Sequence, residues 1–146
     1  LSSMRVNEIC QLYKEDIVKK EGLDCFHLND EKDKTLKNAS SYRVIPIHPI
    51  ILELGFMDYL DSVDHERVWP KLILGKNGYC TAFSKSMGKH IRRHVTNNPK
   101  KVFHSLRDNF AITLRNQGHD DSFIGAFLGH APQNKTTSSY AGAYPL

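Results

Sequence analysis

Apolar residues recur at helical spacing over most of the chain, which predicts a largely helical protein. The first predicted helix follows Ser3, which is placed to cap it, and carries Val6, Ile9, Cys10 and Leu12. The second begins near Pro49 and carries Ile50, Leu54, Met57 and Leu60. A later helix ends near Gly118 and carries Phe103, Leu106, Phe110 and Leu114. A last short helix, capped by Asp120 or Asp121, carries Phe123, Ile124 and Phe127.

Strand-like patterns interrupt the helices in the first third of the chain. Residues 16–18 and 23–28 read as two short strands joined by a turn. Residues 42–47 alternate between polar and apolar positions and include Pro46, which is typical of an edge strand. Together they predict a small antiparallel sheet, with a polar, lysine-bearing loop over 29–41. The predicted fold class is therefore α+β, a mostly helical domain with a small antiparallel sheet at one edge.

The segment 83–95 predicts a helix with two opposite faces. Its apolar face carries Phe83, Met87, Ile91 and Val95. Its basic face carries Lys85, Lys89, Arg92 and Arg93, which we expect to contact the DNA backbone. His90 and His94 stand four apart and could bind a metal from one face, but the surrounding cations oppose a divalent ion.

Length and composition place the 146 residues in one domain, 1–146, with an ordinary 40% hydrophobic content. The abrupt start leads us to expect a fragment cut from a larger protein. The sequence shows no membrane-spanning run and no leader resembling a signal peptide. Three widely spaced cysteines indicate reduced thiols and a cytoplasmic location.

The net charge of +4 is unevenly distributed. Residues 67–107 contain ten Lys and Arg side chains and no Asp or Glu. Such a segment predicts a positive surface that attracts polyanions, although an ordinary solvated surface has the same composition.

A phosphodiester-cleaving site can be assembled from residues at both ends of the chain. His104 and Arg107 stand three apart, so that on a helix both can grip one anion, and the planar guanidinium suits a phosphate. A second arginine, Arg5, would neutralise the charge that builds in the transition state. Tyr140 is the candidate nucleophile, because nearby cations and a histidine would lower the cost of forming its phenolate.

The leaving 5' oxygen needs a proton, for which a flexible loop lysine is a natural donor. We favour Lys37, with Lys34 as its competitor.

Five segments together resemble the tyrosine recombinases, in particular the phage-type integrases, over nearly the whole chain. They are Met4 to Ile9, the lysine before Arg43 to Pro46, His104 to Arg107, Leu128 to His130, and Tyr140-Ala141. The resemblance implies a site-specific recombinase or integrase that cleaves and rejoins double-stranded DNA through a covalent 3'-phosphotyrosyl intermediate, without metal or cofactor, as a homo-oligomer on DNA.

The resemblance also assigns roles to the site residues. It makes Arg5 and Arg107 the phosphate-binding arginines, Lys37 the general acid and Tyr140 the nucleophile. His104 and His130 would be supporting histidines, and Glu8 would brace the site.

The sequence departs from the family pattern in several places. Ser3 replaces a common Gly, and Asp108 replaces a common His and could compete for Arg107. The helices that usually precede the first arginine, and the separate DNA-gripping domain before them, are expected to be absent from this chain.

Three alternatives remain open from the sequence. A type IB topoisomerase shares the chemistry but relaxes one duplex. A catalytically inactive, DNA-binding remnant of an integrase would keep only the basic surface. A metal-dependent nuclease would use the histidines instead of the tyrosine.

Overall fold

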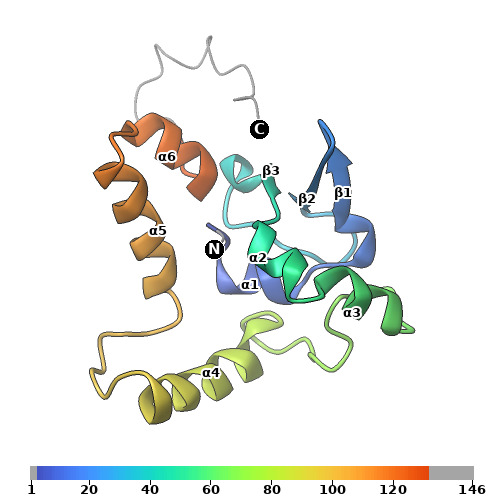
Figure 1. Cartoon of the computed structure of the whole chain (residues 1–146). Helices are drawn as coiled ribbons and strands as arrows, with labels where there is room; N and C mark the ends of the chain where they lie inside the picture. The colour runs from blue at the N-terminus through green and yellow to red at the C-terminus, as the bar shows by residue number, and fades with distance from the viewer. Residues whose placement is uncertain (1–2, 132–146) are drawn as a thin grey trace.

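A three-stranded antiparallel sheet forms one side of the protein in the computed structural model, which describes residues 3–131 (Figure 1). Its strands lie in the order β1 (Ile17–Lys20), β2 (Leu23–Leu28) and β3 (Arg43–Pro46). The turn between β1 and β2 places Glu21 at φ 50° and Gly22 at φ 81°. Two successive positive φ values match the twist of a tight hairpin, which accounts for the glycine. The predicted sheet and its edge strand are confirmed.

The first helix, α1 (Val6–Cys10), begins later than its predicted cap. Arg5 is the N-cap, and the Glu8 carboxylate accepts the Arg5 main-chain N–H at 2.7 Å. The prediction that Ser3 caps α1 is wrong, because the Ser3 hydroxyl instead donates to the Phe127 carbonyl at 2.6 Å. Ser3 thus joins the start of the chain to its last described helix.

The helix predicted after Pro49 is broken into two. α2 (Pro49–Glu53) and α3 (Phe56–Ser62) meet at Gly55, whose φ of 81° lies in the left-handed region. A helix cannot continue through that conformation. The prediction of one helix is wrong because the apolar residues keep their helical spacing on both sides of Gly55.

The remaining helices follow the predicted order. They are α4 (Cys80–His94), α5 (Ser105–Asn116) and α6 (Asp121–Leu128). Asp120 caps α6 by accepting the Phe123 N–H at 2.8 Å, as predicted. Several residues of the predicted apolar faces are exposed, however, among them Leu54 after α2 at 80%, Val95 just beyond the end of α4 at 70%, and Leu106 on α5 at 56%.

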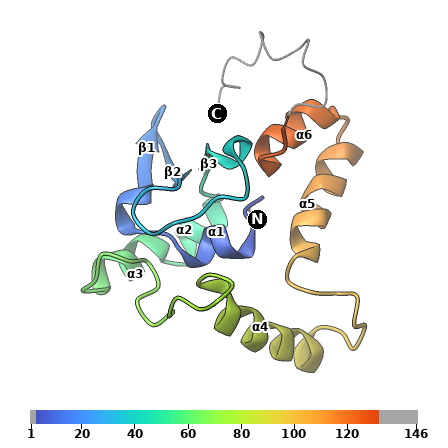
Figure 2. The same cartoon turned by 180° about the vertical axis from the view of Figure 1, so that it is seen from behind.

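The hydrophobic core consists of two clusters. The larger packs the sheet against α1 and α3, and its buried members are Met4, Leu12, Phe26, Leu28, Ile45, Ile47, Leu60 and Val68. The smaller lies between α5 and α6 and contains Ala111, Ile124 and Leu128. Seen from both sides, α5 and α6 stand opposite the sheet while α4 extends along one end (Figures 1 and 2). Polar side chains connect the two parts, because Ser3 and Arg43 both donate to the Phe127 carbonyl of α6.

Two further features bear on the predictions. No helix within residues 3–131 is long and apolar enough to cross a membrane. All three cysteines carry free thiols. The α+β fold class with a small antiparallel sheet is confirmed.

Candidate functional site

Three arginines converge on the carboxyl end of α6, each from a different element. Arg5 caps α1, Arg43 lies on β3 and Arg107 lies on α5. Their donors reach three successive main-chain carbonyls: Arg43 Nε to Phe127 at 2.8 Å, Arg107 Nη2 to Leu128, and Arg5 Nη2 to Gly129 at 3.4 Å. A helix C-terminus carries partial negative charge on its free carbonyls, so cations are stabilised there. We call Arg5, Arg43 and Arg107 the arginine cluster.

Glu8 is the carboxylate that braces the arginine cluster. It lies 2.7 Å from Arg5 Nη1 and 2.9 Å from Arg43 Nη2, with its side chain only 3% exposed. Burial would raise the pKa of Glu8, but the hydrogen bonds and charges of Arg43 and Arg5 outweigh it and hold that pKa below its usual value. Glu8 is therefore ionised at neutral pH and offsets part of the positive charge.

Arg107 is the most confined member of the arginine cluster. It is 5% exposed and donates to the carbonyls of Ser3 and Leu128. Burial, followed by the charges of Arg5 and Arg43, lowers the pKa of Arg107 to about 10. It forms no ion pair within residues 3–131, so its neighbour Asp108 does not compete for it. A bound anion would relieve the repulsion among these guanidinium groups.

His130 follows the left-handed turn at Gly129 that ends α6. Its Nε2 lies 3.4 Å from Nη2 of Arg107. Burial first, and then the charges of Arg107, Arg5, Arg43 and Lys37, lower the pKa of His130. The imidazole is therefore neutral at pH 7 and able to accept a proton.

The two candidate lysines lie in very different surroundings. Lys34 Nζ is 2.5 Å from Asp16 Oδ1, and both side chains are 2% exposed, which makes Lys34 part of the interior. Lys37 is exposed, and its charge acts on His130. Lys37 stays our predicted proton donor, because, unlike Lys34, it is not held in the interior.

His104 is less closely associated with Arg107 than their spacing suggests. It is the exposed N-cap of α5, and its side chain makes no hydrogen bond within the described part of the chain, whereas the Arg107 side chain turns inward to Ser3. Both residues nevertheless line an open cavity of about 590 Å³ between α1 and α5, together with Met4 and Phe110.

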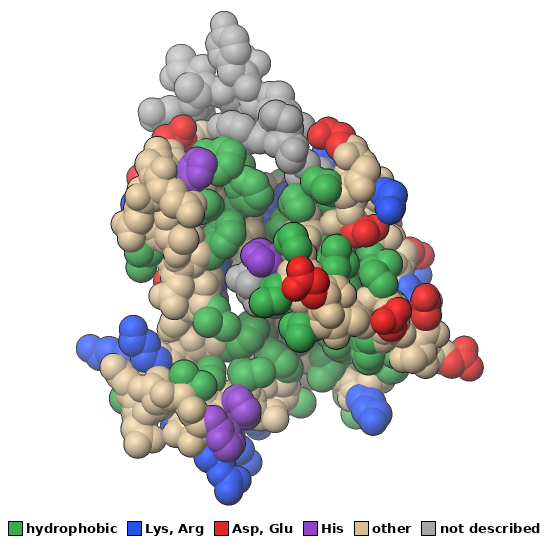
Figure 3. All heavy atoms as spheres, in the orientation of Figure 1, with side chains coloured by type: hydrophobic (Ala, Val, Ile, Leu, Met, Phe, Trp, Pro, Cys, Tyr) green, Lys and Arg blue, Asp and Glu red, His purple; other side chains and the backbone are tan. Residues whose placement is uncertain are grey.

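The basic face of α4 is open to solvent. Its four predicted DNA contacts are all exposed: Lys85, Lys89, Arg92 and Arg93. Figure 3 shows Lys and Arg side chains gathered at the end of the molecule formed by α4. The His90 and His94 rings lie 4.7 Å apart, but residues 3–131 contain no cluster of three or more His, Cys, Asp or Glu side chains that could hold a metal ion.

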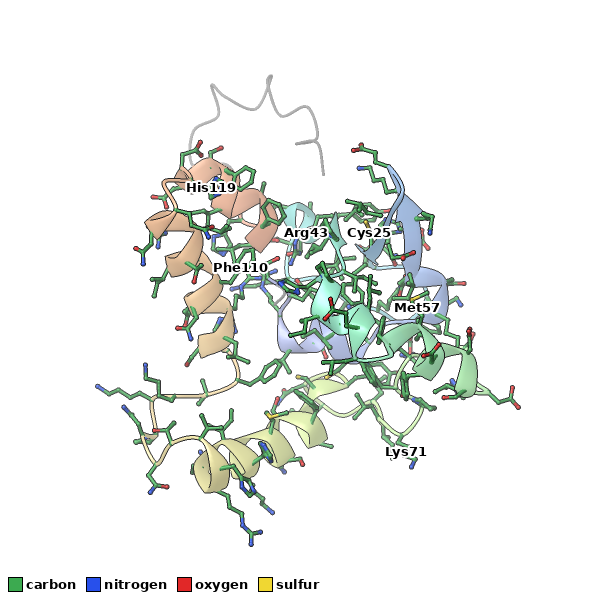
Figure 4. The ribbon with its side chains drawn as sticks, in the orientation of Figure 1. Cys25, Arg43, Met57, Lys71, Phe110 and His119 are labelled. Carbon is green, nitrogen blue, oxygen red and sulfur yellow. The ribbon has the colours of Figure 1, made fainter. Side chains whose placement is uncertain are left out.

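Arg43 was not predicted as a site residue. Figure 4 shows it between α6 and the sheet, and its side chain is 8% exposed. Its place in the sequence could have revealed it, because Arg43 shares one strand face with the buried Ile45 and Ile47, and that face points into the core. A charged residue on such a face needs a buried partner, which here is Glu8.

Tyr140 lies outside the described residues, so the structure gives no position for the predicted nucleophile. The arginine cluster, Glu8 and His130 are in contact with one another, while Lys37 and His104 make no side-chain hydrogen bond or ion pair with them within residues 3–131.

Comparisons with known proteins identify the family and the fold. The model of the Phage integrase family matches residues 1–145. No curated protein matches the sequence. Among solved structures, the chain is similar to that described as "Crystal structure of XerA recombinase", with 17% identity and a TM-score of 0.59, over 98% of this chain and 54% of that chain. The chain thus spans about half the length of that protein, and the likeness is one of fold.

Proposed function

This chain belongs to the phage integrase family, and we propose that it acts as a site-specific DNA recombinase, cleaving and rejoining strands through a 3'-phosphotyrosyl bond to Tyr140. The observation that carries the proposal is the arginine cluster. Two of its three guanidinium groups, those of Arg5 and Arg43, pair with the carboxylate of Glu8, while Arg107 is left without an ion pair among the described residues, beside a neutral histidine. This excess of fixed donors suits a phosphodiester, whose charge rises as it becomes pentavalent.

Each group in the cluster has a separate task. The charges of Arg5 and Arg107 would stabilise the phosphoryl oxygens. Glu8 holds Arg5 and Arg43, and Arg43 bonds to the end of α6, which would keep the site formed before DNA arrives. His104, at the rim of the adjoining cavity, would contact the phosphate when DNA fills the space.

The reaction needs two proton movements. The Tyr140 oxygen would form a bond to phosphorus while the bond from phosphorus to the 5' oxygen breaks. Neutral His130 would take the phenol proton, and Lys37 would give a proton to the departing 5' oxygen. The phosphotyrosyl bond keeps the energy of the broken bond, so rejoining reverses the same steps without a metal or nucleotide cofactor.

Binding of double-stranded DNA would extend beyond this site. The exposed basic face of α4 projects from the same molecule and can contact phosphates without reading sequence. We further propose that cleavage occurs within a homo-oligomer on DNA, because strand exchange joins ends from two duplexes.

The test is capture of a covalent adduct on nicked suicide duplexes. In these the 5'-hydroxyl fragment diffuses away after cleavage, and a randomised core removes the need to know the target. We expect adducts that survive detergent, are unaffected by chelator, and disappear in Tyr140→Phe. Matched Tyr144→Phe keeps the same chemistry four residues away and should still form them.

Three results would overturn the proposal. No adduct with any duplex would favour the inactive remnant, and loss of cleavage in chelator would favour a nuclease. Relaxation of a supercoiled plasmid carrying the recovered site, with no exchange between two such plasmids, would favour a topoisomerase.

A further inference from the structure

The loop that carries Lys37 is fastened to the protein on both sides of that residue. It connects β2 to β3 and spans residues 29–42. A long polar loop of this kind is ordinarily among the most mobile parts of a domain. Here several of its residues bond to groups outside the loop, and none of these contacts has a role in the chemistry described above.

Asp33 is the first anchor, upstream of Lys37. Its carboxylate accepts hydrogen bonds from Tyr13 at 2.8 Å and Tyr79 at 2.5 Å, and it pairs with Arg67. The Arg67 guanidinium lies between the two rings, 4.3 Å from the Tyr13 centroid and 4.1 Å from that of Tyr79. The hydrogen bond from Tyr79 is the largest cause that lowers the pKa of Asp33, followed by those from Tyr13 and Arg67. Burial would raise this pKa, but the three partners outweigh it and hold the value at about 2.

Two further contacts continue this anchor along the backbone. Lys34 is buried against Asp16. The Gln11 side chain pairs with the main chain of Thr35 in both directions, accepting its N–H at 3.1 Å and donating to its carbonyl at 3.0 Å. Residues 33, 34 and 35 are therefore all fixed, and the last of them lies two positions before Lys37.

Asn38 is the second anchor, immediately downstream of Lys37. Its Oδ1 accepts the hydroxyl of Ser41 at 2.6 Å. The oxygen of the same Ser41 hydroxyl accepts Nη1 of Arg5 at 2.9 Å. Asn38 is thus connected through one side chain to the arginine cluster, and it is adjacent in sequence to Lys37.

We propose that Asp33 and Asn38 are positioning residues that hold Lys37 beside the arginine cluster, ready to protonate the leaving 5' oxygen. The inference rests on the proposed strand-cleavage function. Fixing the backbone on both sides leaves only the lysine side chain to be ordered when DNA binds, which raises the effective concentration of the proton donor.

A substrate whose leaving atom is sulfur separates positioning of the proton donor from general damage to the fold. When the 5' bridging oxygen is replaced by sulfur, the thiolate departs without a proton, because a thiol has a pKa of only about 8.5. The Tyr140 oxygen still forms the bond to phosphorus, and the phosphorus–sulfur bond breaks. Both substrates would carry the target sequence recovered from the suicide duplexes.

We expect Lys37→Ala to slow adduct formation by about 10²- to 10⁴-fold on the oxygen substrate. On the sulfur substrate its rate should return to that of the wild type. Asn38→Ala should show the same pattern with a smaller loss, about 10- to 100-fold, at unchanged DNA affinity. Asp33→Asn should behave like Asn38→Ala. Asn98→Ala, which changes an exposed asparagine in the connection between α4 and α5, should be neutral on both substrates.

The outcomes distinguish this inference from the function beneath it. Equal slowing of Asn38→Ala on both substrates, or no slowing on oxygen, overturns the positioning role. Failure of sulfur to rescue Lys37→Ala overturns it too, while leaving cleavage by Tyr140 intact. If the wild-type chain forms no adduct with either substrate, the proposed function itself fails.

Discussion

Nε2 of His130 lies 3.4 Å from Nη2 of Arg107, at the turn where α6 ends. An arginine can only donate hydrogen bonds, so a hydrogen bond at this contact would be accepted by an unprotonated Nε2. The lowered pKa of His130 also favours a neutral ring, because burial and the neighbouring cations both oppose protonation of the imidazole. Contact and burial therefore both favour a neutral His130, which is the state that the proposed mechanism requires.

The pH dependence of cleavage follows from that pKa. His130 in the folded protein loses its proton below the ordinary value of 6.5, so the acceptor is intact throughout the neutral range. We expect the rate of adduct formation to stay level as pH falls from about 8 to 6.5 and to decline only below it. His130→Gln should remove this decline along with most of the activity. A midpoint at or above 6.5 in the wild type would exclude His130 as the acceptor.

Glu8→Gln should destabilise the fold far more than the same change at an exposed ion pair. It removes the buried negative charge that offsets Arg5 and Arg43, which lowers the free energy of unfolding by about 3 kcal/mol. Glu15→Gln is the matched control: Glu15 pairs with Lys32 at 2.9 Å but is 54% exposed, so we expect a loss under about 1 kcal/mol. Urea unfolding measures both, and similar losses would mean that the arginine cluster does not depend on Glu8.

Gly129→Ala tests whether the turn after α6 must approach Arg43 closely. An added Cβ would lie 2.7 Å from Arg43 Nη1 and 3.0 Å from Ser41 Cα, at a φ of 63°. Gly118→Ala is the control, since its φ is 87° but nothing lies within 4 Å of the added Cβ. Both should lose about 1–2 kcal/mol of unfolding free energy from the left-handed backbone.

Only Gly129→Ala should lose further stability, by at least about 1 kcal/mol, from the close contact. It should also slow adduct formation, because Arg43 must shift. Equal unfolding midpoints and equal cleavage rates for the two variants would show that the contact with Arg43 is unimportant.

Asp33 should control part of the acid denaturation. Its folded pKa of about 2 lies below the ordinary 3.8, so its stabilising contribution is complete above 3.8 and is lost as pH falls toward 2. Asp33→Asn should therefore be less stable than wild type at neutral pH, with the difference shrinking through this acid range. Urea unfolding at a series of pH values measures the difference, and a constant gap would contradict the assignment.

The sequence predicted local elements well where a local cause determines them. The β1–β2 hairpin follows from two apolar segments around Gly22, and the start of α6 from its cap Asp120. The break at Gly55 was missed because the apolar spacing continues across it. Leu106 was wrongly assigned to the core because two separate clusters, rather than one, leave that face of α5 uncovered.

The site could be predicted in part, for a related reason. The candidate residue types could be recognised from their order, and Arg5, Arg107 and His130 do come together. Lys34 is held in the interior by Asp16, a contact across 18 positions that no local pattern reveals. Arg43 was overlooked because its partner, Glu8, lies 35 positions away.

Mass spectrometry of the adduct tests the central claim most directly. After digestion of the trapped protein and its DNA, one tyrosine-containing peptide should carry a nucleotide on its side chain. We predict that this residue is Tyr140 and that the nucleotide is attached through its 3' phosphate. A nucleotide on Tyr144, on a histidine or on any other residue, or one attached through a 5' phosphate, would contradict the proposed mechanism.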